Sequence, residues 1–246
     1  MLACQELKID SEKVRKRYND IKDIWNKEDM WHGYTRWRIH RFLQFFFRDK
    51  PVEGCKLLNA GSGGNDYGLN DIEQFHVDIA ESKIKHFSNS LISNIERMPI
   101  KNDEFDYCLC VGSVINYCDA AAVIQEFRRV LKQDGYLILE FEGSKSFEFI
   151  FKSSFDRTAS IAETFYQGSV EQIWIYSERY LKSLLQDNGF RILMVERFHI
   201  FSPIVYRMSK NPNLAARFVR LDLVANFIPV LRTFAANIIL TCVKVS

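Results

Sequence analysis

Apolar residues follow two kinds of spacing along the chain, and from residue 51 onward the two alternate. Short, nearly continuous apolar runs are typical of buried strands, whereas a repeat of three to four residues is typical of amphipathic helices. The pattern predicts strands at 57–58, 75–79, 90–94, 107–111, 136–141, 190–197 and 238–245, and helices at 11–31, 36–48, 120–131, 177–188 and about 214–224. Alternating strands and helices favour an α/β domain built on a parallel sheet.

The first two connections between predicted strands are short. Residues 65–74 and 81–89 must each return the chain to the start of the next strand, although a parallel crossover normally needs about a dozen residues or more. We therefore predict a first crossover helix of one or two turns, and a loop or single turn in the second crossover.

A Gly-rich turn, Gly61-Ser62-Gly63-Gly64, follows the first predicted strand. Glycines allow positive φ angles and let a ligand approach bare backbone. Such a turn at the carboxyl end of a parallel strand is where open α/β sheets bind nucleotide-like ligands, and an acid ending the next strand, here Asp78, accepts bonds from ribose hydroxyls. An ordinary surface turn is the alternative reading of these glycines.

Four segments in order resemble motifs of the class I S-adenosylmethionine (SAM)-dependent methyltransferases: 57–64, 76–80, 94–100 and 105–113. The resemblance spans about residues 50–200. It implies a three-layer Rossmann-like α/β fold with a seven-stranded, mostly parallel sheet and an antiparallel edge strand at 238–245. It also implies SAM as the cofactor. We expect backbone amides after the first strand to face the sulfonium nucleoside.

The matched motif positions give the candidate cofactor residues. They are Asn59, Gly61, Ser62, Gly63, Asp78, Ile79, Asn94, Ile95, Glu96, Gly112 and Ser113. Two positions depart from the family pattern, because Asn59 replaces the usual acid and Asn65 replaces the last glycine. An amide at position 59 loses a charge-assisted contact, which is roughly twice as strong as a neutral one.

The resemblance further implies a helical lid at 1–50, a SAM-binding domain at 51–246 and a substrate cap inserted at 144–172. The candidate catalytic residues are His32 and Tyr34, which we place on a loop beside Gly33, and Tyr117 after the fourth strand. Glu140 is a second candidate base, Asn116 a further acceptor-side residue, and Tyr18 and Trp25 further lid residues. Plain packing or surface roles are the alternatives for these side chains.

Charge is concentrated at the two ends of the chain. Residues 11–50 hold 11 Lys/Arg against 6 Asp/Glu and residues 201–246 hold 6 against 1, although the net charge of all 246 residues is only +2. Two basic flanks meeting over the site would favour an anionic acceptor; a solvated basic surface is the alternative. The cysteines lack metal-binding spacing, which together with the absence of a signal-like start predicts no metal site and a cytoplasmic location.

The function predicted from these motifs is methyl transfer from SAM to a small-molecule, saccharide or lipid-linked acceptor. Two alternatives remain: an RNA methyltransferase that uses the basic flanks, or a SAM-binding regulatory or scaffold protein without catalysis. Polar residues and Pro229 interrupt the apolar run 223–243, so no membrane span is predicted. The oligomeric state stays open.

Overall fold

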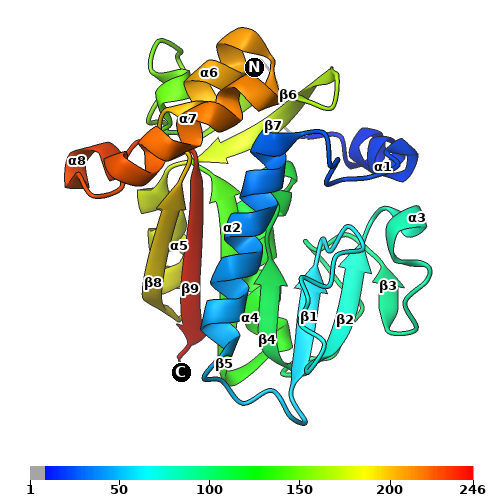
Figure 1. The fold of residues 1–246 in the computed structure, drawn as a ribbon. Helices are drawn as coiled ribbons and strands as arrows, with labels where there is room; N and C mark the ends of the chain where they lie inside the picture. The colour runs from blue at the N-terminus through cyan, green and yellow to red at the C-terminus, as the bar shows by residue number, and fades with distance from the viewer. Residues whose placement is uncertain (1–8, 246) are drawn as a thin grey trace, which may run out of the picture.

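A seven-stranded sheet forms the centre of the computed structural model, which describes residues 9–245 (Figure 1). Its strands are β1 (Lys56–Ala60), β2 (Glu73–Asp78), β3 (Ser90–Ile92), β4 (Phe105–Cys110), β5 (Leu131–Glu142), β8 (Phe190–Phe198) and β9 (Asn237–Lys244). The spatial order is β3-β2-β1-β4-β5-β9-β8. The pairs β1–β2, β1–β4, β2–β3 and β4–β5 are parallel, which confirms the predicted fold class.

The antiparallel strand is β9, but it does not lie at the edge. It pairs antiparallel with both β5 and β8, so β8 closes the sheet and the predicted edge position is wrong. Every residue of β9 is buried, as expected for a strand with a partner on each side and both faces covered. A continuous apolar run therefore marked an interior strand.

Helices cover both faces of the sheet. On one face, α2 (Met30–Phe47) buries Ile39 and Leu43 against Leu57 of β1 and Leu109 of β4. On the other face, α4 (Ala120–Val130) and α5 (Glu178–Asp187) pack their apolar stripes on the opposite side chains of the same strands. The period-two alternation of strand side chains thus supplies two separate cores.

The short crossovers differ from each other. No helix forms between β1 and β2, so the predicted first crossover helix is wrong; instead Tyr67, Leu69 and Ile72 of the loop are buried against α2. Positive φ angles at Tyr67 and Gly68 are incompatible with a right-handed helix there. The second crossover contains the single turn α3 (Glu81–Ile84), as predicted.

The N-terminal segment forms a shorter helix than predicted. Helix α1 (Ser11–Asp20) is capped by Asp10, whose Oδ1 accepts from the Glu12 and Lys13 amides. The next helix, α2, already begins at Met30. His32 and Tyr34 therefore lie in the first turn of a helix and not on a loop.

The remaining elements lie beyond the carboxyl ends of the parallel strands (Figure 1). They are the hairpin β6 (Ala159–Tyr166) and β7 (Ser169–Tyr176), and helices α6 (Ser202–Ser209), α7 (Pro212–Ala225) and α8 (Pro229–Arg232). The hairpin falls largely within the predicted cap. Within residues 9–245, every helix is too short or too polar to cross a bilayer.

Candidate functional site

A cavity lies where the carboxyl ends of β1, β2 and β4 meet α1, the start of α2, β6 and α6. Ten of the eleven candidate cofactor residues line it; the exception is Asn59. His32 and Tyr117 also line the cavity, whereas Tyr34 does not. Tyr34 accepts a hydrogen bond from Arg38 and stacks on Trp37 on another side of α2.

The backbone amides of the Gly-rich loop are hydrogen-bonded within the protein, mostly to the end of β2. The N–H groups of Gly61 and Ser62 donate to the Val77 carbonyl at 2.7 and 3.2 Å. That of Gly63 donates to Asp78 Oδ2 at 2.8 Å and that of Gly64 to Ser62 Oγ at 3.3 Å. These amides therefore already have partners within the protein, and the expected contact between backbone amides and the nucleoside stays a prediction. The loop meets the cavity through bare Cα surfaces, which positive φ at Gly61 and Gly63 makes possible.

Asp78 ties the end of β2 to this loop. Its Oδ2 accepts from Gly63 and its Oδ1 accepts from the Ala80 amide at 2.8 Å. Burial raises the pKa of Asp78, and the amide bonds oppose that rise. Each carboxylate oxygen keeps a second acceptor site, so the side chain can still accept a hydroxyl from the cavity it lines.

Asn59 holds the loop from behind. Its Nδ2 donates to the Asn65 carbonyl at 2.7 Å and to Gln74 Oε1 at 3.1 Å. Both partners are acceptors, so an ionised acid at position 59 would have no proton to offer them. These two hydrogen bonds explain why position 59 has an amide where the family usually has an acid. The Asn59 side chain does not line the cavity.

Glu140 and Asn116 are structural in the same way. Glu140 is fully buried, and its Oε2 accepts from the Gly112 and Ser113 amides at 2.8 and 2.6 Å. Asn116 donates to the carbonyls of Glu142 and Trp174. Neither lines the cavity. Glu140 fixes the turn that presents Gly112 and Ser113, and it has no route to act as a base on a bound acceptor.

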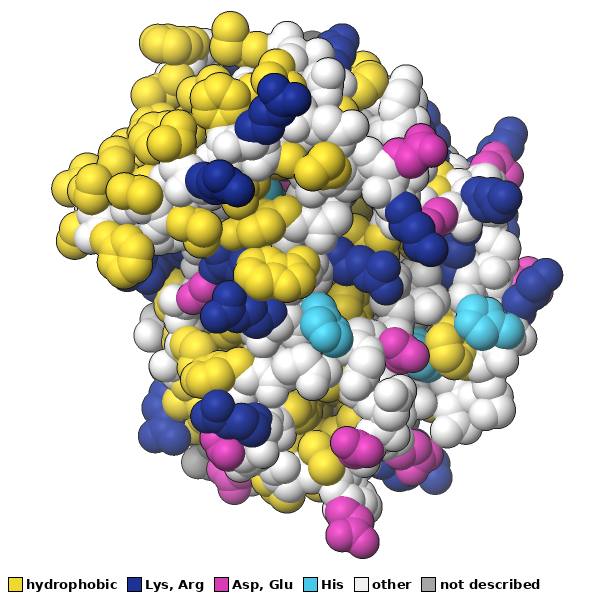
Figure 2. All heavy atoms as spheres, in the orientation of Figure 1, with side chains coloured by type: hydrophobic (Ala, Val, Ile, Leu, Met, Phe, Trp, Pro, Cys, Tyr) yellow, Lys and Arg dark blue, Asp and Glu magenta, His cyan; other side chains and the backbone are white. Residues whose placement is uncertain are grey.

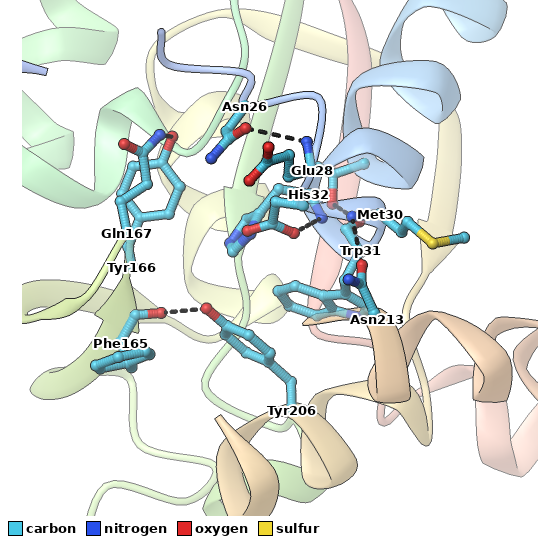
Figure 3. Close-up of polar contacts among 12 residues, drawn as sticks. Asn26, Glu28, Met30, Trp31, His32, Phe165, Tyr166, Gln167, Tyr206 and Asn213 are labelled. Carbon is cyan, nitrogen blue, oxygen red and sulfur yellow. Dashed lines mark hydrogen bonds and ion pairs between the residues drawn. The ribbon is translucent and has the colours of Figure 1, made fainter. Parts of the chain in front are cut away.

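His32 enters the cavity with an orienting partner (Figure 3). Its Nδ1 lies 2.5 Å from Asp29 Oδ2, and its backbone N–H donates to Asp29 Oδ1 at 2.9 Å. Burial acts to raise the pKa of Asp29, but the bonds from His32 outweigh it and the pKa is lowered. A carboxylate can only accept, so Nδ1 carries a proton, and in the neutral imidazole Nε2 keeps its lone pair. The sequence feature that could have indicated this pair is an Asp three residues before a His at the start of a helix.

Aromatic side chains surround the imidazole. Tyr166 of β6 lies 4.8 Å and Tyr206 of α6 lies 5.3 Å from the His32 ring, centroid to centroid (Figure 3). The indole of Trp31 stacks on Tyr206, and its buried Nε1 has no partner among the described residues. This part of the cavity offers flat apolar faces to a planar ligand.

Two cavity acids escaped sequence reasoning, Glu142 and Glu148. Burial raises the pKa of Glu142 to about 8, with repulsion from Glu148 and Glu140 adding to the effect. Burial also raises the pKa of Glu148 to about 7, opposed by Arg207. Glu142 ends β5 and Glu148 sits in a short turn after it. No local pattern marks them, because the burial that perturbs them comes from elements distant in the sequence.

A polar chain closes the cavity on the α1 side. The hydroxyls of Tyr18 and Tyr117 lie 2.9 Å apart, and Tyr117 donates to Glu171 of β7. Arg17 forms an ion pair with Glu171 and donates to the Tyr166 carbonyl at 2.7 Å. Helix α1 is thereby fastened over the site by the hairpin.

Comparison with known proteins agrees with the motif resemblance. Residues 56–139 match the family model described as "Methyltransferase domain". A protein from Methanocaldococcus jannaschii is 28% identical over 137 residues, covering 50% of this chain and 60% of that relative. The C-methyltransferase UbiE of ubiquinone and menaquinone biosynthesis in Rickettsia massiliae is 25% identical over 218 residues, covering 74% of this chain and 88% of UbiE.

Solved structures share the fold at low sequence identity. The cyclase SpnF aligns with a TM-score of 0.62 at 16% identity, over 97% of each chain. The 1,6-didemethyltoxoflavin-N1-methyltransferase of Burkholderia thailandensis, solved with S-adenosylhomocysteine, aligns with a TM-score of 0.58 at 13% identity, over 96% of this chain and 87% of that one. The shared fold confirms the predicted fold class, and the match over residues 56–139 agrees with the resemblance to SAM-dependent methyltransferases.

Proposed function

We propose that this chain, whose residues 56–139 form a SAM-dependent methyltransferase domain, methylates a small-molecule acceptor held in the aromatic part of the cavity. One observation carries the proposal. A single cavity runs from the Gly-rich loop and Asp78 to His32, Tyr117 and Glu142. Donor and acceptor would thus share one enclosed space, which an in-line displacement requires.

The residues at the donor end fit SAM. A Cβ on Gly61 would lie 2.3 Å from Val114 Cγ1, and one on Gly63 would lie 2.6 Å from Ile24 Cδ1. Glycine at these two positions therefore lets Val114 and Ile24, which also line the cavity, pack directly against the loop. Asp78 would accept from the ribose, and Asn94 to Glu96 would lie along the adenine. SAM would supply the electrophilic methyl group on its sulfonium.

The acceptor end favours a compact ligand over a polymer. Helix α1, the β6–β7 hairpin and α6 close over it, and Tyr18, Trp25, Tyr166 and Tyr206 contribute to its lining. Aromatic faces of this kind suit a planar or apolar acceptor. The relatives named for quinone and toxoflavin chemistry act on such compounds, and this supports a small-molecule acceptor over RNA.

His32 is the proposed proton acceptor. Asp29 holds the Nδ1–H, so Nε2 can take a proton from an acceptor hydroxyl, amine or activated carbon as the methyl group arrives. Glu142, whose pKa is raised to about 8, is mostly neutral at pH 7 and can donate a hydrogen bond to an acceptor oxygen; Glu148, whose pKa is raised to about 7, can do so in its protonated half. Tyr117 donates its one hydroxyl proton to Glu171, so it would line the acceptor space without donating to the acceptor.

Product detection tests the proposal. The purified chain is incubated with SAM and, in separate reactions, with quinols and phenols, N-heterocycles, saccharides, lipid-linked acceptors and RNA, and S-adenosylhomocysteine is measured. We expect release that depends on a small-molecule acceptor and falls in a His32→Gln variant. Transfer to RNA alone, or SAM binding without transfer to any acceptor, would contradict the proposal.

A further inference from the structure

Large apolar side chains gather on the outer surface of α7 and α8. Figure 2 shows them as the yellow area over the region where Figure 1 draws these helices. We define the α7–α8 surface by its exposed apolar residues, which are Leu214, Leu221, Leu223, Val224, Phe227, Ile228 and Val230. Phe227 is 88% exposed and Val230 is 68% exposed. A contiguous apolar area of this kind marks an interaction site.

Helix α7 is apolar on the face away from the protein as well as on the face toward it. Ala215 and Val219 are buried toward the neighbouring helices α2 and α6, and Ala225 is buried against Ile200 and Ala235. Leu221 and Val224 lie on the outward side. The larger side chains point outward, so packing within the chain does not account for them.

The charges beside this surface are all positive. Lys210, Arg217 and Arg220 are exposed, and Asp222 is the only acid from residue 200 to 246. Asp222 is buried, accepting from the Ser202 hydroxyl and from the Phe201 amide at 2.6 Å. The surface thus offers cations and apolar groups, with no exposed carboxylate among its described residues.

We propose that the α7–α8 surface binds the face of an anionic lipid bilayer. Apolar side chains inserted at the headgroup boundary, with Lys and Arg beside them, are the two features of a helix that lies in a membrane interface. A second copy of this chain fits less well. In a two-fold contact the surface would face itself and bring Arg217 and Arg220 toward their own copies without an acid between them.

The proposed bilayer-binding surface lies one helix away from the cavity. Tyr206 of α6 lines the cavity and packs in one cluster with Trp31, Ala215 and Val219, the last two from α7. A bilayer bound at the α7–α8 surface would therefore lie next to α6, which covers the acceptor end of the cavity. The binding itself does not depend on the proposed reaction.

Vesicle co-sedimentation tests this inference. The full chain is mixed with vesicles of phosphatidylcholine alone or of phosphatidylcholine with phosphatidylglycerol, at low and high salt. We compare wild type with Phe227→Asp/Val230→Asp and with Arg217→Gln/Arg220→Gln. The matched controls are Ile92→Asp/Leu193→Asp and Arg179→Gln/Arg191→Gln, which change exposed residues elsewhere. Thermal midpoints verify that every variant is folded.

We expect salt-sensitive binding to the anionic vesicles, weakened roughly tenfold or more by each α7–α8 variant and unchanged by the controls. Equal binding to both vesicle types, equal loss in the controls, or no binding would overturn the inference. Self-association that Phe227→Asp/Val230→Asp abolishes, without vesicle binding, would overturn it in favour of a dimer contact.

Discussion

Glu142 is a half-buried acid that lines the cavity, and its protonation state affects both ligand binding and stability. Burial first, and repulsion from Glu148 and Glu140 second, raise its pKa to about 8. An unfolded glutamate titrates near its ordinary value of about 4.3. Between the two values the folded chain binds more protons than the unfolded chain, so the free energy of unfolding falls as pH rises.

Glu142→Gln should remove much of this pH dependence. The stability contributed by the neutral acid is full below the unfolded pKa and is lost as pH rises through the folded pKa of about 8. We expect wild type to lose more stability than the variant between about pH 5 and about pH 9. Urea unfolding at the two pH values measures this. Parallel losses in both proteins would contradict the assignment.

The pair of His32 and Asp29 predicts a specific kinetic pattern. We expect His32→Gln to lower kcat by roughly 10²–10⁴-fold, and Asp29→Asn to lower it by a similar factor. In the Asn variant Oδ1 can still accept from the His32 amide, but Nδ2 would donate to Nδ1 and leave the ring proton on Nε2. The dissociation constant for SAM should stay near that of wild type in both. Weakened SAM binding with unchanged kcat would instead indicate a purely positioning role.

Single residues were the hardest part of the site to predict from sequence. The positions around Gly61 and Asp78 follow strand ends, and their place at the cavity could be predicted from local pattern. Asn59 could not be interpreted locally, because its role depends on Gln74 across the loop. Glu142 and Glu148 carry no motif, and their altered pKa values arise from burial by other elements.

At the scale of elements, α1 is the part of the N-terminal region that closes the cavity. Arg17 joins it to β6 and β7 through the Tyr166 carbonyl and Glu171, and Tyr18 bonds to Tyr117. Helix α2, by contrast, is a layer of the fold that covers one face of the sheet. We therefore propose that, of the lid predicted at residues 1–50, α1 and the loop after it form the part that covers the cavity; residues 1–8 lie outside the described residues.

Arg17→Gln should loosen this lid. The change leaves Glu171, a buried carboxylate, without its cation, which costs about 1–3 kcal/mol of unfolding free energy. Limited proteolysis within 21–29 should become faster, and bound SAM should slow it again. Lys16→Gln is the matched control, since Lys16 is exposed on the same helix. Equal cleavage rates in the two variants would contradict the proposal that Arg17 holds the lid in place.

Element lengths were predictable where apolar periodicity was strong, as in α4 and α5. They failed where a turn overrode the pattern. The 11–31 helix stops at Asp20, and the loop after β1 folds on buried Tyr67 and Leu69 without a helix. These outcomes depend on contacts with α2 and the cavity wall, which the local sequence does not encode.

For the whole molecule, the order of the motifs was enough to predict a Rossmann-like sheet. Each short apolar run forms a strand, and the side chains on the two faces of the sheet pack into two separate hydrophobic cores. The position of β9 between β5 and β8 was not predictable from its composition, because burial on both faces makes an interior and an edge strand look alike in sequence.

The central claim is that SAM binds at the Gly-rich loop with Asp78 on its ribose, and isothermal titration calorimetry with SAM tests it most directly. We expect a dissociation constant between about 1 μM and 1 mM, the usual range for substrates. It should weaken at least about tenfold in Asp78→Asn and stay unchanged in the exposed control Asp71→Asn. The absence of heat from folded wild-type protein, or equal affinity in all three proteins, would contradict the account.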